Sequence, residues 1–209
     1  MNESCVAGVL LAAGMSTRLG QPKQLLAWRG RTLLRHAAGE GLAAGLDRLV
    51  VVIGAEAEAM RRELAGLPVV VVENARYAEG QSTSLRAGLA ALPPGVDAAV
   101  MLLVDMPGVN AAAIRALVAA WEASGAPIVR PTYQGRPGNP VLFAAPLLPE
   151  LARAQGDEGG RAVLRAHAGE VLHLPTDNPG VVQDIDTWEA YNALAEGRAD
   201  PSATTSPGR

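Results

Sequence analysis

The sequence predicts an α/β fold in which helices cover both faces of a mostly parallel central sheet. Short runs of apolar and β-branched residues alternate along the chain with longer stretches rich in Ala and Leu. Nearly continuous apolar strands of this kind are typical of parallel sheets that are buried on both faces. The chain has 209 residues, of which 49% are hydrophobic and 3% aromatic, so we expect a core of Val, Leu, Ala and Ile.

The first half of the chain repeats the order of strand and helix four times. Apolar runs predict strands at residues 6–11, 49–53, 69–72 and 98–104. Helical spacing predicts helices at residues 32–44, 56–64, 82–92 and 111–123, and the first three are followed by glycine or proline.

The pattern changes after Pro127. Short apolar runs at residues 128–131 and 140–143 flank a Gly- and Pro-rich link, helical segments follow at 147–152 and 161–168, and closing strands are expected at 171–174 and 181–185. Thr187 is a fair N-cap for a last helix at 187–195. Residues 1–196 are therefore interpreted as a single domain, and residues 197–209, rich in Pro, Ser and Thr, as a disordered tail.

Charge and hydropathy argue against several classes of partner. A net charge of −3 lacks the basic excess that a nucleic-acid or anionic-membrane surface needs. Apolar runs stay below the roughly 18 residues of a membrane span, and the amino terminus lacks a basic signal-peptide region. Cys5 is the one cysteine and makes no internal disulfide, which fits a reducing compartment. We expect a cytoplasmic protein without a nucleic-acid or membrane partner.

A polar loop follows the first expected strand, in the stretch VLLAAGMSTRLGQPKQLL. Ligands of open parallel sheets bind beyond the carboxyl ends of the strands, which is where this loop lies. Gly14 can adopt a positive φ and bring backbone N–H groups close to a ligand. Ser16 and Thr17 add hydroxyls, and Arg18 and Lys23 add cations suited to phosphate oxygens. The loop matches neither the Walker spacing GxxxxGK[ST] nor the dinucleotide fingerprint GxGxxG, although it is a candidate for binding phosphate.

Two further motifs place carboxylates near the expected ends of strands. Asp105 lies in VDMP at the end of the strand at 98–104, and Asp184 and Asp186 lie in QDIDT, where a strand would place both on one face. Mg²⁺ that bridges phosphates prefers one or two such carboxylates. The alternative interpretations are a turn at Asp105 and a helix cap at Asp186.

The stretch LAAGMSTRLGQPKQLL resembles the signature LA[AG]GxSxR[ML]GxxKxL of the MobA/MocA-like nucleotidyltransferases, which act on sugar nucleotides and molybdopterin. The resemblance extends over about residues 5–195. It implies a Rossmann-like three-layer sandwich of the nucleotide-diphospho-sugar transferase type. It also implies that Arg18 and Lys23 hold the triphosphate, that Asp105 binds metal with Asp186 or Asp184, and that backbone atoms of the following residues hold the nucleotide: Leu11, Ala12, Ala13 and Gly14.

Two more segments fit the family pattern. NARYAEGQSTS matches Nx₅GxxxS, which implies contacts of Asn74, Gly80, Ser82 and Ser84 with the base and ribose, although plain helix capping is an alternative. GRPGNPVLF and GDEGGR match the segments that line the acceptor side, a subregion of about residues 128–185. The candidate acceptor-binding residues are Arg136, Asn139, Asp157 and Arg161, with Asp157 alternatively orienting Arg161.

The branch that the sequence resembles most is the molybdenum cofactor cytidylyltransferases, because the loop reads Ala-Ala-Gly and the later motif reads Asp-Ile-Asp-Thr. The methyl group of Ala13 would crowd a larger purine. This branch implies a magnesium-dependent transfer of CMP from CTP to the phosphate of molybdopterin, with release of pyrophosphate and a possible molybdoenzyme partner. The alternatives are a guanylyltransferase, a sugar- or alcohol-phosphate nucleotidyltransferase, and a non-catalytic cofactor chaperone for an enzyme of the xanthine dehydrogenase type.

Overall fold

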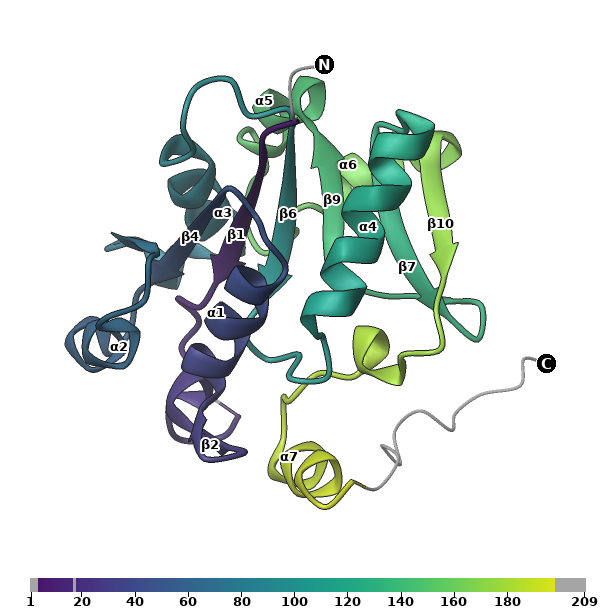
Figure 1. Cartoon of the computed structure of the whole chain (residues 1–209). Helices are drawn as coiled ribbons and strands as arrows, with labels where there is room; N and C mark the ends of the chain where they lie inside the picture. The colour runs from purple at the N-terminus through teal and green to yellow at the C-terminus, as the bar shows by residue number, and fades with distance from the viewer. Residues whose placement is uncertain (1–3, 17, 198–209) are drawn as a thin grey trace.

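The computed structural model describes residues 4–16 and 18–197, and its centre is a mostly parallel sheet in the order β10–β7–β9–β6–β1–β4–β5 (Figure 1). β9 runs antiparallel to β6 and β7, and the short β8 pairs antiparallel with β7. The strands of this sheet are β1 (Val6–Leu11), β4 (Arg48–Ile53), β5 (Val70–Glu73), β6 (Ala98–Leu103), β7 (Ile128–Tyr133), β8 (Arg136–Pro137), β9 (Val141–Ala144) and β10 (Val171–Pro175). The predicted α/β class with a mostly parallel sheet is confirmed.

Seven α-helices are described, together with a two-stranded hairpin. The helices are α1 (Leu33–Ala43), α2 (Ala57–Leu64), α3 (Gln81–Ala90), α4 (Ala111–Ser124), α5 (Leu148–Leu151), α6 (Arg161–Ala166) and α7 (Trp188–Ala195). The hairpin consists of β2 (Ala27–Trp28) and β3 (Arg31–Thr32), which the sequence did not predict. Among the described residues, none of the helices is long and apolar enough to cross a bilayer.

Alternation along the strands produces a core on each face of the sheet. On β1, Leu10 packs in a cluster with residues of α1, α2 and α4, whereas Val9 packs in a second cluster with residues of α3, α5 and α6. Successive side chains of a strand point to opposite faces, so every buried strand feeds both cores. α1 and α4 cross in front of the sheet in Figure 1, and α3 lies behind it. The result is a three-layer α/β/α sandwich.

The expected strand at residues 181–185 is wrong. A 3₁₀ helix spans Pro179–Val182, and the chain continues to residue 186 without strand pairing. The backbone of Gly180 lies so close to Gly108 that a Cβ on Gly108 would be 2.5 Å from the Gly180 Cα. This contact directs the segment across the carboxyl ends of the strands, where the Ile185 N–H donates to the Asp105 carbonyl oxygen at 2.8 Å. Val181 and Ile185 are buried there, which explains the strand-like apolar pattern.

A third, smaller hydrophobic cluster joins the loop after β1, the hairpin and α7. Its buried members include Leu19, Trp28 and Ile185, and Tyr191 of α7 packs against them. The Tyr191 hydroxyl donates to the Ala27 carbonyl oxygen at 2.6 Å. Figure 1 shows α7 and β2 beyond the carboxyl ends of β1 and β6. This cluster brings the polar loop and the acidic segment around Ile185 together. The predicted disordered tail, apart from Gly197, lies outside the described residues.

Candidate functional site

A cavity of about 600 Å³ lies at the carboxyl ends of β1 and β6. Six separate segments contribute to its walls: the loop after β1, the VDMP turn, the start of α3, the region of β8, the start of α6, and residues 181–186. Twelve of the residues singled out from the sequence line it, namely Leu11, Ala13, Gly14, Lys23, Ser84, Asp105, Arg136, Asn139, Asp157, Arg161, Asp184 and Asp186. Parallel strands end at the same edge, so motifs far apart in the chain meet here.

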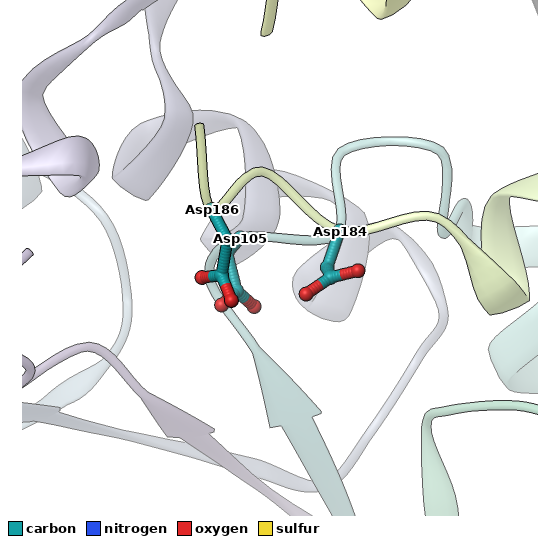
Figure 2. A group of neighbouring side chains, drawn as sticks. All are labelled: Asp105, Asp184 and Asp186. Atoms are coloured by element: carbon teal, nitrogen blue, oxygen red, sulfur yellow. The ribbon is translucent and has the colours of Figure 1, made fainter. Parts of the chain in front are cut away.

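Three carboxylates lie close together in the wall of the cavity. One oxygen each from Asp105, Asp184 and Asp186 lies within 4.8 Å of the others. Figure 2 shows Asp105 directly after a strand, with Asp186 and Asp184 on the crossing segment beside it. Ile185 between them is fully buried, and its N–H is bonded to the Asp105 carbonyl oxygen. Burial of this one side chain therefore holds the two neighbouring carboxylates beside Asp105.

Lys23 lies inside this acidic cluster. Its Nζ donates to Asp105 Oδ2 at 2.6 Å and to Asp186 Oδ1 at 2.9 Å, and it lies 3.4 Å from the Ile185 carbonyl oxygen. Arg18 donates to Asp186 Oδ2 at 3.2 Å from an exposed position. Both cations that the family resemblance assigns to the triphosphate thus lie next to the carboxylates.

Burial and neighbouring charges shift the pKa values of the groups in this cluster in different directions. Burial alone would lower the pKa of Lys23, but Asp105 and Asp186 outweigh it, so the pKa is raised. The hydrogen bond from Lys23 lowers the pKa of Asp186. Burial, together with the charges of Asp105 and Asp186, raises the pKa of Asp184. The cluster thus combines three carboxylates with one lysine and one exposed arginine, and its carboxylate oxygens are groups that can bind a cation.

The cluster fits a hard divalent cation. Asp105 Oδ1 is buried and has no hydrogen-bond partner among the described residues. An unsatisfied buried acceptor costs about 1–3 kcal/mol, which a bound cation would offset. Mg²⁺ and Mn²⁺ take oxygen ligands of this type, and one or two carboxylates are sufficient when phosphates supply the rest.

The loop after β1 is held by a residue that sequence reasoning missed. Gln24 is fully buried, and its Nε2 donates to the carbonyl oxygens of Ala12 at 2.8 Å and Gly14 at 2.7 Å. The Ser16 hydroxyl accepts from the Lys23 N–H at 3.0 Å and lies 3.4 Å from Gln24 Oε1. Ser16 therefore stabilises the loop from within. A glutamine directly before two leucines was the signal that could have been noticed.

Two details of the loop differ from the expectations. Gly14 lacks the positive φ suggested for it, which Gly20 has instead, at 69°. A Cβ added to Gly14 would meet no atom within 4 Å, so its open side faces the cavity that it lines. The Ala12 N–H donates to the Val52 carbonyl oxygen at 2.8 Å, which leaves it unavailable to a ligand. Thr17 lies outside the described residues.

The NARYAEGQSTS segment forms the wall beside the start of α3. The buried Asn74 side chain donates to the hydroxyls of Thr83 at 2.8 Å and Ser84 at 2.9 Å. Ser84 lines the cavity, whereas Asn74, Gly80 and Ser82 are not among the lining residues. Asn74 thus orients a hydroxyl that the cavity exposes.

Asp157 of the GDEGGR segment binds the same helix start. Its Oδ1 accepts from the Gln81 N–H at 3.2 Å, and the Ser82 N–H donates to the Gly156 carbonyl oxygen at 3.0 Å. A Cβ on Gly80 would lie 2.8 Å from the Gly156 backbone, so only glycine permits this approach. Asp157 therefore caps α3, and the contact with Arg161 that the sequence left open is not among its bonds in the described chain.

An open cavity at the carboxyl edge, with a carboxylate cluster beside a lysine-bearing loop, is typical of an enzyme that binds a metal–polyphosphate. The comparison with known families agrees with this class. Residues 8–179 match the MobA-like NTP transferase domain, and the chain belongs to this family.

Three relatives of known name are similar over almost the whole chain. Nicotine blue oxidoreductase of Paenarthrobacter nicotinovorans is 34% identical, covering 91% of this chain and 96% of the relative. Purine catabolism protein PucB of Bacillus subtilis is 31% identical, covering 93% and 98%. Molybdenum cofactor cytidylyltransferase of Escherichia coli is 26% identical, covering 92% and 97%.

A solved structure extends the similarity to three dimensions. Rv0371c of Mycobacterium tuberculosis, in a complex with manganese, is 34% identical and superimposes with a TM-score of 0.78, covering 92% of this chain and 99% of that one. A divalent metal is therefore present in a homologue of the same fold.

Proposed function

We propose that this protein transfers CMP from CTP to the phosphate of molybdopterin and releases pyrophosphate. The observation that carries the proposal is the cluster of Asp105, Asp184 and Asp186 around Lys23, on the wall of a cavity large enough for a nucleotide. Membership in the MobA-like family and the similarity to the cytidylyltransferase of E. coli support it.

The residues of the chain have distinct roles in this reaction. A bound divalent cation would neutralise the charge on the triphosphate oxygens and on the leaving pyrophosphate. Asp105 and Asp186, with Asp184 beside them, hold that cation. The protein supplies position and charge and needs no nucleophile, because the acceptor phosphate attacks the α-phosphorus in line.

Lys23 changes partners in this proposal. Without substrate its ammonium group compensates Asp105 and Asp186. A divalent cation held by these carboxylates would take the place of the Lys23 ammonium group, and Lys23, with Arg18 beside it, would then be free to donate to the phosphate oxygens. Before substrate binds, Asp105 and Asp186 raise the pKa of Lys23, so Lys23 enters the reaction as a cation.

The proposal assigns the residues of the cavity wall to the two substrates. Ala13, which is buried but lines the cavity, limits the room beside the base and favours cytosine over a purine. The backbone of Gly14 and the Ser84 hydroxyl lie on the same nucleotide side. Arg136, Asn139 and Arg161 line the same cavity, and in this proposal they bind the acceptor. The expected setting is the cytoplasm, next to a molybdoenzyme that receives the product.

Pyrophosphate release tests the proposal. We expect release with CTP, Mg²⁺ and molybdopterin together, and little with GTP, ATP or UTP. Asp105→Asn removes a charged cation ligand and should lower turnover at least 100-fold while keeping the circular dichroism spectrum. Asp177→Asn, the same change at an exposed residue outside the cavity, is the control and should retain full activity. Turnover of Asp105→Asn at the wild-type rate would contradict the metal assignment.

Mn²⁺ titration followed by electron paramagnetic resonance separates the two later carboxylates. We expect Asp186→Asn to weaken Mn²⁺ binding more than Asp184→Asn, because Asp186 and Asp105 already converge on one cation, the Lys23 ammonium group, at 2.9 and 2.6 Å. Release of pyrophosphate with GTP instead of CTP would favour a guanylyltransferase, and release with a sugar phosphate would favour that class of acceptor. Cofactor binding without release would favour the chaperone alternative.

A second candidate function comes from the relative in P. nicotinovorans, which is named an oxidoreductase and is 34% identical to this chain. Oxidation of a reduced nicotinamide dinucleotide by the purified protein, measured at 340 nm with an electron acceptor present, tests it. Asp105→Asn again discriminates: a redox reaction that needs no metal would survive this change, whereas nucleotidyl transfer would not.

A further inference from the structure

A second cavity of about 170 Å³ adjoins the main one, and we call it the inner chamber. The two cavities share Leu11, Gln81, Leu103, Asn139 and Arg161 in their walls. The inner chamber also has apolar walls from several elements, formed by Leu85, Met101, Val141, Phe143 and Leu164. A volume of this size corresponds to about six waters at roughly 30 Å³ each, so it can hold a substituent of a larger ligand.

Arg130 is the unexpected residue of the inner chamber. It belongs to β7, which lies between the edge strand β10 and β9, and alternation places it on the same face as the buried Ile128. Its Nε donates to the Gly138 carbonyl oxygen at 2.8 Å, which fixes the guanidinium group. An arginine is rarely placed among buried strands without a charged partner.

Neither arginine of the chamber has a carboxylate partner in residues 4–16 and 18–197. Glu158, the one acidic residue in the chamber wall, is paired with Arg165 at 2.7 Å. Arg130 and Arg161 both line the chamber, and burial, followed by the positive charge of Arg161, lowers the pKa of Arg130. Arginine remains charged in proteins, so the chamber presents two like charges without a counter-ion.

Such an arrangement favours an anion with an apolar body. An oxyanion between the two guanidinium groups would relieve their repulsion and accept charge-assisted hydrogen bonds. The apolar walls would at the same time bury a ring or short chain. Inorganic phosphate would make only the hydrogen bonds to the guanidinium groups. A neutral ring would only bury apolar surface.

We propose that the inner chamber binds an amphipathic anion, an apolar ring or short chain that carries an oxyanion, and that Arg130 with Arg161 selects this oxyanion. This binding goes beyond the proposed function and does not depend on it, because it requires neither nucleotide nor metal.

Calorimetric titration of the metal-free protein with small probes tests the proposal. Phenyl phosphate and benzoate combine a ring with an oxyanion, whereas inorganic phosphate lacks the ring and benzyl alcohol lacks the charge. We expect at least one of the first two to bind 10-fold or more tighter than both of the others. The tighter of the two identifies the oxyanion as phosphate or carboxylate.

Variants locate the binding. Arg130→Gln should weaken the tighter probe about 10- to 100-fold, the equivalent of one or two charge-assisted hydrogen bonds. Arg130→Lys should retain part of the affinity. Arg48→Gln, the same loss of charge at an exposed residue on the opposite edge of the sheet, is the matched control and should bind like the wild type. If Arg130→Gln fails to fold, a shift of the Arg130 Nε–Hε resonance on titration of the wild type replaces it.

Three results would overturn the proposal. Benzyl alcohol could bind as well as the anions, the Arg130 variants could bind like the wild type, or Lys23→Met could abolish binding, which would place the anion in the main cavity. Pyrophosphate release is a separate readout. Its failure would reject nucleotidyl transfer while the probe titration still decides whether the inner chamber binds an amphipathic anion.

Discussion

Replacing Gln24 by leucine tests whether one buried amide holds the loop after β1. Leucine has a similar volume but leaves the carbonyl oxygens of Ala12 and Gly14 without their donor. Because Ala12 is buried, its unsatisfied carbonyl oxygen lowers the free energy of unfolding by about 1–3 kcal/mol. The carbonyl oxygen of the exposed Gly14 can bond to water instead, so the loss there is about 0.5–1.5 kcal/mol. We therefore expect the free energy of unfolding to fall by about 2–4 kcal/mol.

Urea denaturation followed by circular dichroism measures this change. With a slope of roughly 2 kcal/mol per molar urea, the midpoint should fall by about 1–2 M while the slope stays constant. Gln21→Leu is the matched control, because Gln21 is exposed on the same loop, and it should change stability by less than about 0.5 kcal/mol. Equal midpoints for the two variants would refute the role of Gln24.

Two further predictions concern stability away from the cavity. Gly88→Ala places a Cβ 2.4 Å from Val9 Cγ1 and should lower the stability measured by thermal melting by about 1–3 kcal/mol. Gly169→Ala is the control, because its Cβ meets no atom within 4 Å, and equal losses of stability in the two variants would argue against this packing. Hydrogen bonds to two glutamates raise the pKa of His167 above 6.5, so their contribution is complete below pH 6.5 and is lost as the pH rises through the raised value. His167→Gln should therefore lower the urea midpoint at pH 5.5 and leave it unchanged at pH 9, and a pH-independent effect would contradict this.

Most secondary structure could be predicted because its causes are local. The apolar run of β1 matches the structure residue for residue, and Thr32 and Thr187 cap their helices as side-chain acceptors. The segment at 181–185 was misassigned for an equally physical reason. Val181 and Ile185 are buried, but under a chain that crosses the strand ends, and a period of two does not reveal which surface buries them.

The candidate site was predictable in its members but not in their partners. The motifs named the three carboxylates and the lysine, and all four line one cavity. Ser16 was expected to face phosphate and instead bonds within its own loop. Gln24 and Arg130 were missed because each donates to a backbone carbonyl oxygen, a partner that no sequence motif records.

The sequence by itself determined the alternation of strand and helix, the polar loop after the first strand and the residue types available for phosphate and metal, because burial and turn geometry act over a few residues. Only the tertiary structure decided that Lys23 meets carboxylates 82 and 163 residues away, and that Arg130 lies near Arg161. These neighbours depend on the order of strands in the sheet, since the carboxyl ends of β1, β6 and β7 meet at one edge only after the strands have paired. The interaction energy of two charges depends on their distance in space and not on their separation along the chain, so the fold determines the electrostatics of the site.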